Sequence, residues 1–151
     1  MYIEAPNRWD GLGASIFLAG GITDCGDWQI HIANRIAAAC GETPLHVLNP
    51  RRADFPMGDP SAAEEQIQWE FQHLRLATAV AFWFCPPTLN PISLFEYGKH
   101  IVGSKPIFVG CDPLYARRDD VLIQTRLERP DLELVGTLDQ LAEQVLAWHA
   151  G

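Results

Sequence analysis

Residues 78–100, TAVAFWFCPPTLNPISLFEYGKH, join an apolar run to a segment that carries a single acidic side chain. The run 78–84 is apolar almost throughout, which predicts a central strand that is buried on both faces of a sheet. Pro91 suits the first turn of a helix and Asn90 is a candidate N-cap, so the pattern predicts a helix soon after this strand. Ligands of open α/β sheets bind at the carboxyl ends of the strands. Glu96 on this helix is therefore either a satisfied polar contact or a reactive group, and we favour the second.

Short apolar runs and amphipathic segments alternate along the rest of the chain. We expect strands at residues 14–19, 45–48, 78–84, 106–110 and 132–135. We expect helices at residues 28–40, 61–76, 91–102, 117–128 and 138–149, the first capped by Asp27 and the second by a capping box of Ser61 and Glu64. Residues 1–13 are expected to form a polar lead-in. This alternation predicts one α/β domain over residues 1–151, a five-stranded parallel sheet with helices on both faces.

The composition is that of an acidic globular protein, with a formal net charge of −8, 48% hydrophobic residues and 20% charged residues. Such a charge argues against a nucleic-acid polymer or an anionic membrane as the main partner. No apolar run approaches the roughly 20 residues that span a bilayer, and the first residues show no secretory signal pattern. The four cysteines have no metal-ligand spacing. We therefore expect reduced thiols, no metal site and a cytoplasmic protein.

Three predicted strand ends bring polar and aromatic residues to one edge of the sheet. The first strand ends in glycines, which let the backbone approach a ligand closely. The loop after the second strand is long, and long loops in compact domains are often functional; its arginines could bind a phosphate or carboxylate, or be solvated surface charges. Gln66 and Glu70 share one helix face because they are four residues apart. The substrate-binding candidates are Gly20, Gly21, Ile22, Thr23, Asn49, Arg51, Phe55, Gln66, Trp83 and Asn90.

An acidic side chain beside aromatic walls, with few basic groups, suits chemistry that passes through a cation-like sugar. Its carboxylate can attack an anomeric carbon and hold a covalent glycosyl intermediate, as in retaining glycosidases. The glycine pair is not followed by the pattern of a dinucleotide-binding or P-loop site, and no Ser-His-Asp set or zinc-protease motif can be placed. We therefore expect a small-molecule substrate and no cofactor.

Two motifs resemble the nucleoside 2-deoxyribosyltransferase family, and more closely its divergent "transferase-like" branch. They are FLAGGI at residues 17–22 and LFEYG at residues 94–98, and the likeness extends over about residues 14–135. It implies a flavodoxin-like (Rossmann-like) three-layer sandwich with a five-stranded parallel sheet. It also implies an enzyme that displaces the base of a nucleoside or nucleotide and passes the sugar to a second base or to water. Because a neighbouring subunit usually completes the site in this family, the resemblance implies a homodimer or larger homo-oligomer.

The resemblance also assigns catalytic roles, with Glu96 at the position of the family's nucleophile. The family places an aspartate six residues before it, where this chain has Asn90, which can form hydrogen bonds but cannot transfer a proton. A second family aspartate lies on the preceding helix, near Glu70, so Glu70 is implied as the group that protonates the leaving base. Asn90 favours an alternative, a non-catalytic nucleotide-binding module on the same fold. A third interpretation is that Glu96 only bridges groups inside the fold.

Overall fold

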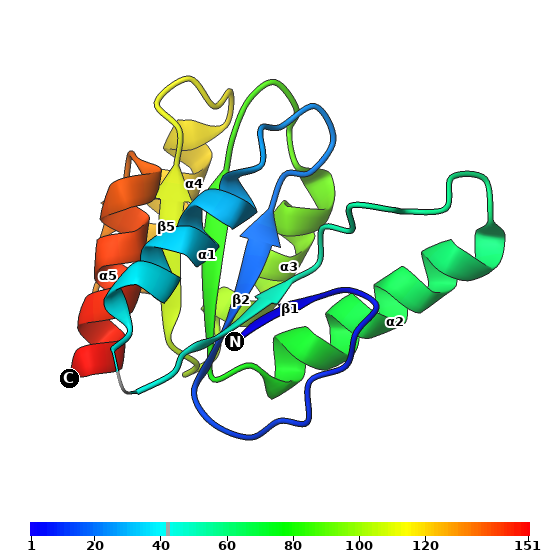
Figure 1. Cartoon of the computed structure of the whole chain (residues 1–151). Coiled ribbons are helices and arrows are strands. Elements are labelled where there is room, and N and C mark those ends of the chain that lie inside the picture. Colours follow the sequence, from blue (N-terminus) through cyan, green and yellow to red (C-terminus); the bar gives the residue numbers. More distant parts are fainter. Residues whose placement is uncertain (42) are drawn as a thin grey trace.

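The structure is a computed structural model that describes residues 1–41 and 43–151. Within these residues the chain forms one sheet of six parallel strands in the order β1-β3-β2-β4-β5-β6 (Figure 1). The strands are β1 (Tyr2–Glu4), β2 (Ser15–Gly20), β3 (His46–Asn49), β4 (Ala79–Phe84), β5 (Ile107–Cys111) and β6 (Leu134–Val135). The helices are α1 (Trp28–Ala39), α2 (Pro60–Leu76), α3 (Pro91–Ile101), α4 (Arg118–Glu128) and α5 (Leu138–Ala150).

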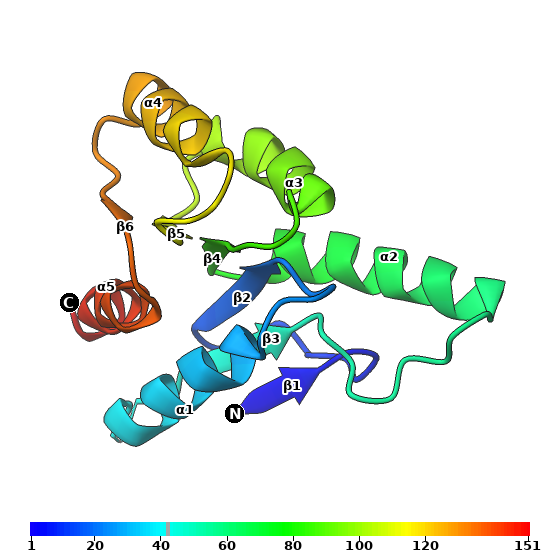
Figure 2. The same cartoon turned by 90° about the horizontal axis from the view of Figure 1, so that it is seen from above.

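Helices cover both faces of the sheet, which makes three layers (Figure 2). One hydrophobic cluster packs α1 and α5 against the sheet, through buried residues such as Ile32 and Leu141. The other packs α2, α3 and α4 against the opposite face, through Trp69, Tyr97 and Val121. The predicted α/β three-layer architecture is therefore confirmed. The five strands β3-β2-β4-β5-β6 have the 2-1-3-4-5 order of flavodoxin-like folds.

The expected number of strands is wrong, because β1 adds a sixth strand at the edge of the sheet. The pairing runs from Tyr2 opposite Val47 to Glu4 opposite Asn49. Residues 1–13 are thus not wholly a lead-in. Three residues are too few to show the alternation that predicts a strand, and their pairing depends on an edge that only the folded sheet provides. Ile3 contributes to the core on the α2 side.

The helix starts differ from the expectations at two of three positions. Asp27 caps α1, as expected, by accepting a hydrogen bond from the Ile30 amide. The capping box at Ser61 is wrong: Asp59 is the N-cap of α2, and its carboxylate accepts hydrogen bonds from the Ser61 amide and hydroxyl. Pro60, at the first helical position, moves the helix start one residue earlier than predicted. Asn90 occupies the N-cap position of α3, but its side chain does not cap the helix.

Strand β4 forms the middle of the molecule, and all six of its residues are buried. Its side chains alternate between the two faces, so Phe82 and Phe84 pack toward α2 and α3 while Ala81 and Trp83 pack toward α1 and α5. This is the arrangement expected of a parallel strand with helices on both sides. None of the helices in the described part of the chain combines the length and apolar character needed to cross a bilayer.

Candidate active site

A cleft with a volume of about 370 Å³ opens where β2 and β4 end, beside the start of α3. Its lining consists of Phe17, Ala19, Gly20, Gly21, Ile22, Thr23, Pro50, Glu70, Thr88, Asn90, Pro91, Ile92, Ser93 and Glu96. The chain therefore places its cleft at the carboxyl edge of the parallel sheet, where this class of fold binds ligands. A cleft of this size accommodates a nucleoside-sized molecule.

Two carboxyl groups from different helices face this cleft. Glu96 comes from α3 and Glu70 from α2, and both side chains are half-buried. Burial raises the pKa of Glu96 to about 7, the nearby Glu70 carboxylate adds to this rise, and Lys99 opposes it. Burial also raises the pKa of Glu70, against a hydrogen bond of 2.8 Å that its Oε1 accepts from Gln66. Pairs of carboxyl groups with raised pKa values are typical of sites that hold and move a proton.

The glycine pair after β2 forms one wall of the cleft, and both glycines are required by close packing. A Cβ on Gly21 would lie 2.4 Å from Nδ2 of Asn90 and 2.6 Å from Sγ of Cys25. A Cβ on Gly20 would lie 2.5 Å from the ring of Trp28 and equally close to the Trp83 carbonyl. The absence of side chains lets the loop after β2 lie directly against the loop after β4. The cleft wall is therefore backbone at this point.

Asn90 lines the cleft, but its side-chain amide is hydrogen-bonded to other groups of the protein. Its Oδ1 accepts a hydrogen bond of 3.0 Å from the Cys85 amide, and its Nδ2 donates one of 2.7 Å to the Thr88 hydroxyl. Its backbone is left-handed, with φ 47°, a conformation that asparagine tolerates better than most residues. Asn90 thus closes the loop after β4, and this internal bonding explains why its side chain does not cap α3.

Two predicted binding residues, Asn49 and Arg51, lie outside the cleft lining. The Asn49 side chain donates to the Tyr2 hydroxyl at 2.6 Å and accepts from the Arg51 amide at 3.0 Å. The Arg51 guanidinium donates to the carbonyls of Cys25 and Gly26 and to the Gln29 side chain. Arg51 therefore ties the loop after β3 to the loop after β2, and its position gives no support for contact with a substrate.

Phe55 also lies outside the lining, and it packs beneath a second arginine. The Arg52 guanidinium sits 5.5 Å from the centre of the Phe55 ring and pairs with Glu65 of α2 at 3.1 Å. Gln66 does not line the cleft either, but it donates to Glu70 and, at 2.6 Å, to the Pro50 carbonyl. The prediction that Gln66 and Glu70 share one helix face is confirmed by that hydrogen bond.

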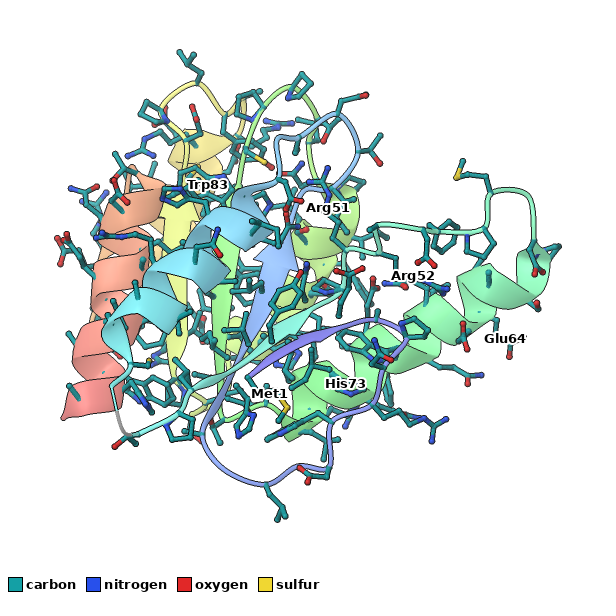
Figure 3. All side chains as sticks on the ribbon, viewed as in Figure 1. Met1, Arg51, Arg52, Glu64, His73 and Trp83 are labelled. Atoms are coloured by element: carbon teal, nitrogen blue, oxygen red, sulfur yellow. The ribbon has the colours of Figure 1, made fainter. Side chains whose placement is uncertain are left out.

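Trp83 lies on the opposite face of the sheet from the cleft, on the side of α1 (Figure 3). Its ring packs closely against Gly110. Trp83 was predicted to bind the substrate, but it does not line the cleft. In a strand that is apolar on both faces, composition does not show which side chains point to the α1 side of the sheet and which to the α2 side. The aromatic residue that reaches the cleft is Phe17, from the neighbouring strand β2.

Several residues of the cleft were not predicted from the sequence as site residues: Phe17, Ala19, Pro50, Thr88, Pro91, Ile92 and Ser93. One of them carried a usable signal. Ser93 precedes Glu96 by three residues, so the two belong to the same face of α3. Thr88 had no such signal, because the loop after β4 has no regular period. Both residues add a hydroxyl group to a lining that already contains that of Thr23.

The model of the family described as nucleoside 2-deoxyribosyltransferase like matches residues 13–115. The chain belongs to this family. The matched part includes every residue named above as lining the cleft, and it ends soon after β5. Membership indicates a nucleoside deoxyribosyltransferase-like function. A comparison with curated proteins gave no match.

Proposed function

We propose that this protein cleaves the N-glycosidic bond of a nucleoside or nucleotide, deoxy forms included, and transfers the sugar to another base or to water. One observation carries the proposal: two carboxyl groups from different helices, Glu96 and Glu70, face one cleft at the carboxyl edge of the sheet. Retaining cleavage of a glycosidic bond needs one carboxylate as nucleophile and one carboxylic acid as proton donor. Membership of the family supports the same class of reaction.

The proposed reaction has two steps. In the first, a Glu96 oxygen bonds to the anomeric carbon, the carbon–nitrogen bond breaks, and its electron pair leaves with the base. Glu70 donates its proton to the departing base. In the second step water or another base attacks the anomeric carbon, the ester bond to Glu96 breaks, and Glu70 takes up a proton from the attacking group. Splitting the displacement in this way gives two easier steps in place of one.

The two carboxyl groups are expected to share one proton near neutral pH. Burial raises the pKa of both, and the charge of Glu70 raises the pKa of Glu96 further. In the empty cleft this effect favours the proton on Glu96. A bound substrate reverses the preference, because positive charge at the anomeric carbon stabilises the Glu96 carboxylate while the leaving nitrogen draws the proton from Glu70. The Gln66 hydrogen bond then stabilises the Glu70 carboxylate that remains.

The alternative function is nucleotide binding without turnover, and two observations favour it. A Glu96 pKa of about 7 leaves about half of the molecules with a protonated, non-nucleophilic Glu96 at neutral pH when the cleft is empty. The Asn90 amide is bonded inside the protein and has no proton to give to a leaving base. A binding module would hold a nucleoside in the cleft and release it unchanged.

The experiment that separates these functions follows two products at once. The full chain is incubated with a panel of deoxynucleosides, deoxynucleotides and their ribose forms, and then quenched in acid. Chromatography detects freed base, and mass spectrometry of the intact protein detects a covalent sugar. We expect freed base with at least one member of the panel, together with a protein species heavier by one sugar residue. A ligand that raises the melting temperature but yields neither product would reject cleavage and support the binding module.

The dependence of the rate on pH tests the shared proton. We expect a bell-shaped profile of the rate of base release, because only the form with one proton holds both a nucleophile and an acid. On the alkaline side of the profile the rate should decrease around pH 7, where the second carboxyl group of the pair ionises. Initial rates between pH 4.5 and pH 9, in buffers of matched ionic strength, check this. A rate that stays level above pH 8 would show that Glu70 is not the acid.

A further inference from the structure

Two thiol groups that are far apart in the chain lie in contact behind the cleft wall. The Sγ atoms of Cys25 and Cys85 lie 3.0 Å apart, although 60 positions separate the residues in the sequence. Both side chains are buried, and both thiols are free. Cys25 belongs to the loop after β2, and Cys85 directly follows β4. In the part of the chain that the structure describes, no other pair of sulfur atoms lies within hydrogen-bonding distance.

We propose that Cys25 and Cys85 are a modification site, at which a mild oxidant forms a reversible disulfide. A disulfide bond is about 2.05 Å long, so the two sulfur atoms need to approach by about 1 Å. Cys25 is placed to make this movement because it lies in a loop between β2 and α1 and not inside a helix or strand. Its amide donates to the Ile22 carbonyl at 3.2 Å and its carbonyl accepts from Arg51, so the approach of the sulfurs comes mainly from rotation of the Cys25 side chain.

An oxidant can reach the pair from the side away from the cleft. A second hollow, with a volume of about 380 Å³, is lined by Trp28, Trp83, Cys85 and Pro86 among others. It lies on the α1 side of the sheet, where Trp28 and Trp83 belong to the hydrophobic cluster. The thiol pair thus sits between this hollow and the wall of the cleft. A molecule as small as hydrogen peroxide fits in this hollow, and Cys85 is part of its wall.

The chemical step balances with hydrogen peroxide as the oxidant. Burial and the adjacent Cys25 thiol raise the pKa of Cys85, so Cys25 is the sulfur that attacks a peroxide oxygen as thiolate. The oxygen–oxygen bond breaks, a sulfenic acid forms on Cys25, and the departing hydroxide takes up a proton as water. The second sulfur then attacks the sulfenic sulfur, and the sulfur–oxygen bond breaks to release a second water. Two thiols are oxidised to one disulfide and one peroxide is reduced to two waters. Dithiothreitol reverses the change by thiol–disulfide exchange.

The disulfide would act on the cleft because the thiols support its wall. Gly21 packs against Cys25 Sγ, and the Asn90 amide lies 4.0 Å from the same atom. The Cys85 amide donates to the Asn90 side chain. Drawing the two sulfurs together therefore shifts the loop that carries Gly21 relative to Asn90, both of which line the cleft. This effect on turnover rests on the function proposed above, whereas formation of the bond does not.

The test measures the bond first and its effect second. The reduced full chain is treated with hydrogen peroxide, blocked with iodoacetamide under denaturing conditions, and examined by intact mass and by peptide mapping without reduction. We expect the number of free thiols to fall from four to two, and a peptide that joins Cys25 to Cys85. The linked peptide should disappear in Cys25→Ser and Cys85→Ser and persist in Cys40→Ser, which removes a partly exposed thiol at the end of α1.

Two results would overturn the proposal: addition of oxygen to one sulfur without a linked peptide, or a linked peptide that contains Cys40 or Cys111. If a serine variant fails to fold, the peptide map of the unchanged protein still decides between these outcomes.

The second measurement is the rate of base release, which we expect to fall about 10-fold or more on oxidation and to recover with dithiothreitol. A linked peptide in a protein that shows no base release before oxidation would leave the disulfide established and reject the proposed function alone.

Discussion

Replacing Glu96 with glutamine is expected to lower the rate of base release by about 10⁴-fold or more, because the amide cannot form the glycosyl ester. Glutamine keeps the size of the side chain, so the shape of the cleft is preserved. The same substitution should abolish the protein species that carries a covalent sugar. Rates are measured with excess enzyme over a long incubation, since the residual activity is small. Release of base at an unchanged rate would remove Glu96 from the mechanism.

The control for this variant is its free energy of unfolding, which should rise at high pH while the rate of base release falls. The Glu96 pKa rises from 4.5 to about 7 on folding, so the folded protein holds this proton more tightly than the unfolded chain. The stability that this contributes is complete below pH 4.5 and is lost as the pH rises through about 7. Glutamine does not ionise, so at pH 8.5 the free energy of unfolding of Glu96→Gln should exceed that of the original protein by about 2 kcal/mol. Near pH 4, where Glu96 is protonated, the two proteins should be equally stable. Denaturant titrations at these two pH values measure the difference.

Replacing Glu70 with glutamine is expected to lower the rate of base release by about 10²- to 10⁴-fold, the range typical for loss of a general acid. The loss should be largest for the bases that leave least readily, because these depend most on protonation as the glycosidic bond breaks. A base that leaves easily as an anion should lose much less. The measurement is the ratio of variant to original rates across a series of bases of different acidity.

The chain offers a matched control on the same helix. Glu64 accepts a hydrogen bond of 3.0 Å from Gln68, four residues away, as Glu70 does from Gln66. Glu64 is exposed and lies near the start of α2, outside the cleft lining (Figure 3). Glu64→Gln should therefore leave the rate unchanged for every base. An equal loss for all bases in Glu70→Gln would mean that Glu70 shapes the cleft and does not donate the proton.

The position of Glu96 near the cleft was anticipated from local patterns, whereas that of Glu70 was implied only by the family resemblance. Apolar runs identified the five main strands, and parallel strands place the loops and helices that follow them at a common edge. Because Glu96 lies on the helix after β4, it had to lie near that edge. Gln66 and Glu70 were placed on one face by helical spacing alone, and their hydrogen bond confirms it. These inferences hold because helix and strand periods are set by nearby residues.

The residues whose positions differ from the expectations depend on contacts between distant segments. Arg51 was a plausible ligand for a phosphate, but the loop after β2 brings two carbonyls to its guanidinium. Trp83 was a candidate for substrate binding, but the direction of its side chain follows from which face of β4 meets which helix. Strand β1 exists because its short run pairs with the edge of β3.

The sequence by itself determined an acidic α/β protein with a parallel sheet, and it placed one glutamate on the helix that follows the central strand. Tertiary structure alone decided that a second carboxyl group faces the same cleft, that burial raises the pKa of Glu96 to about 7, and that Cys25 and Cys85 meet behind the wall. The physical reason is the distance along the chain over which each interaction acts. Helix and strand patterns arise within a few residues of the chain, whereas burial, repulsion between charges and contact between thiols depend on atoms that only folding brings together.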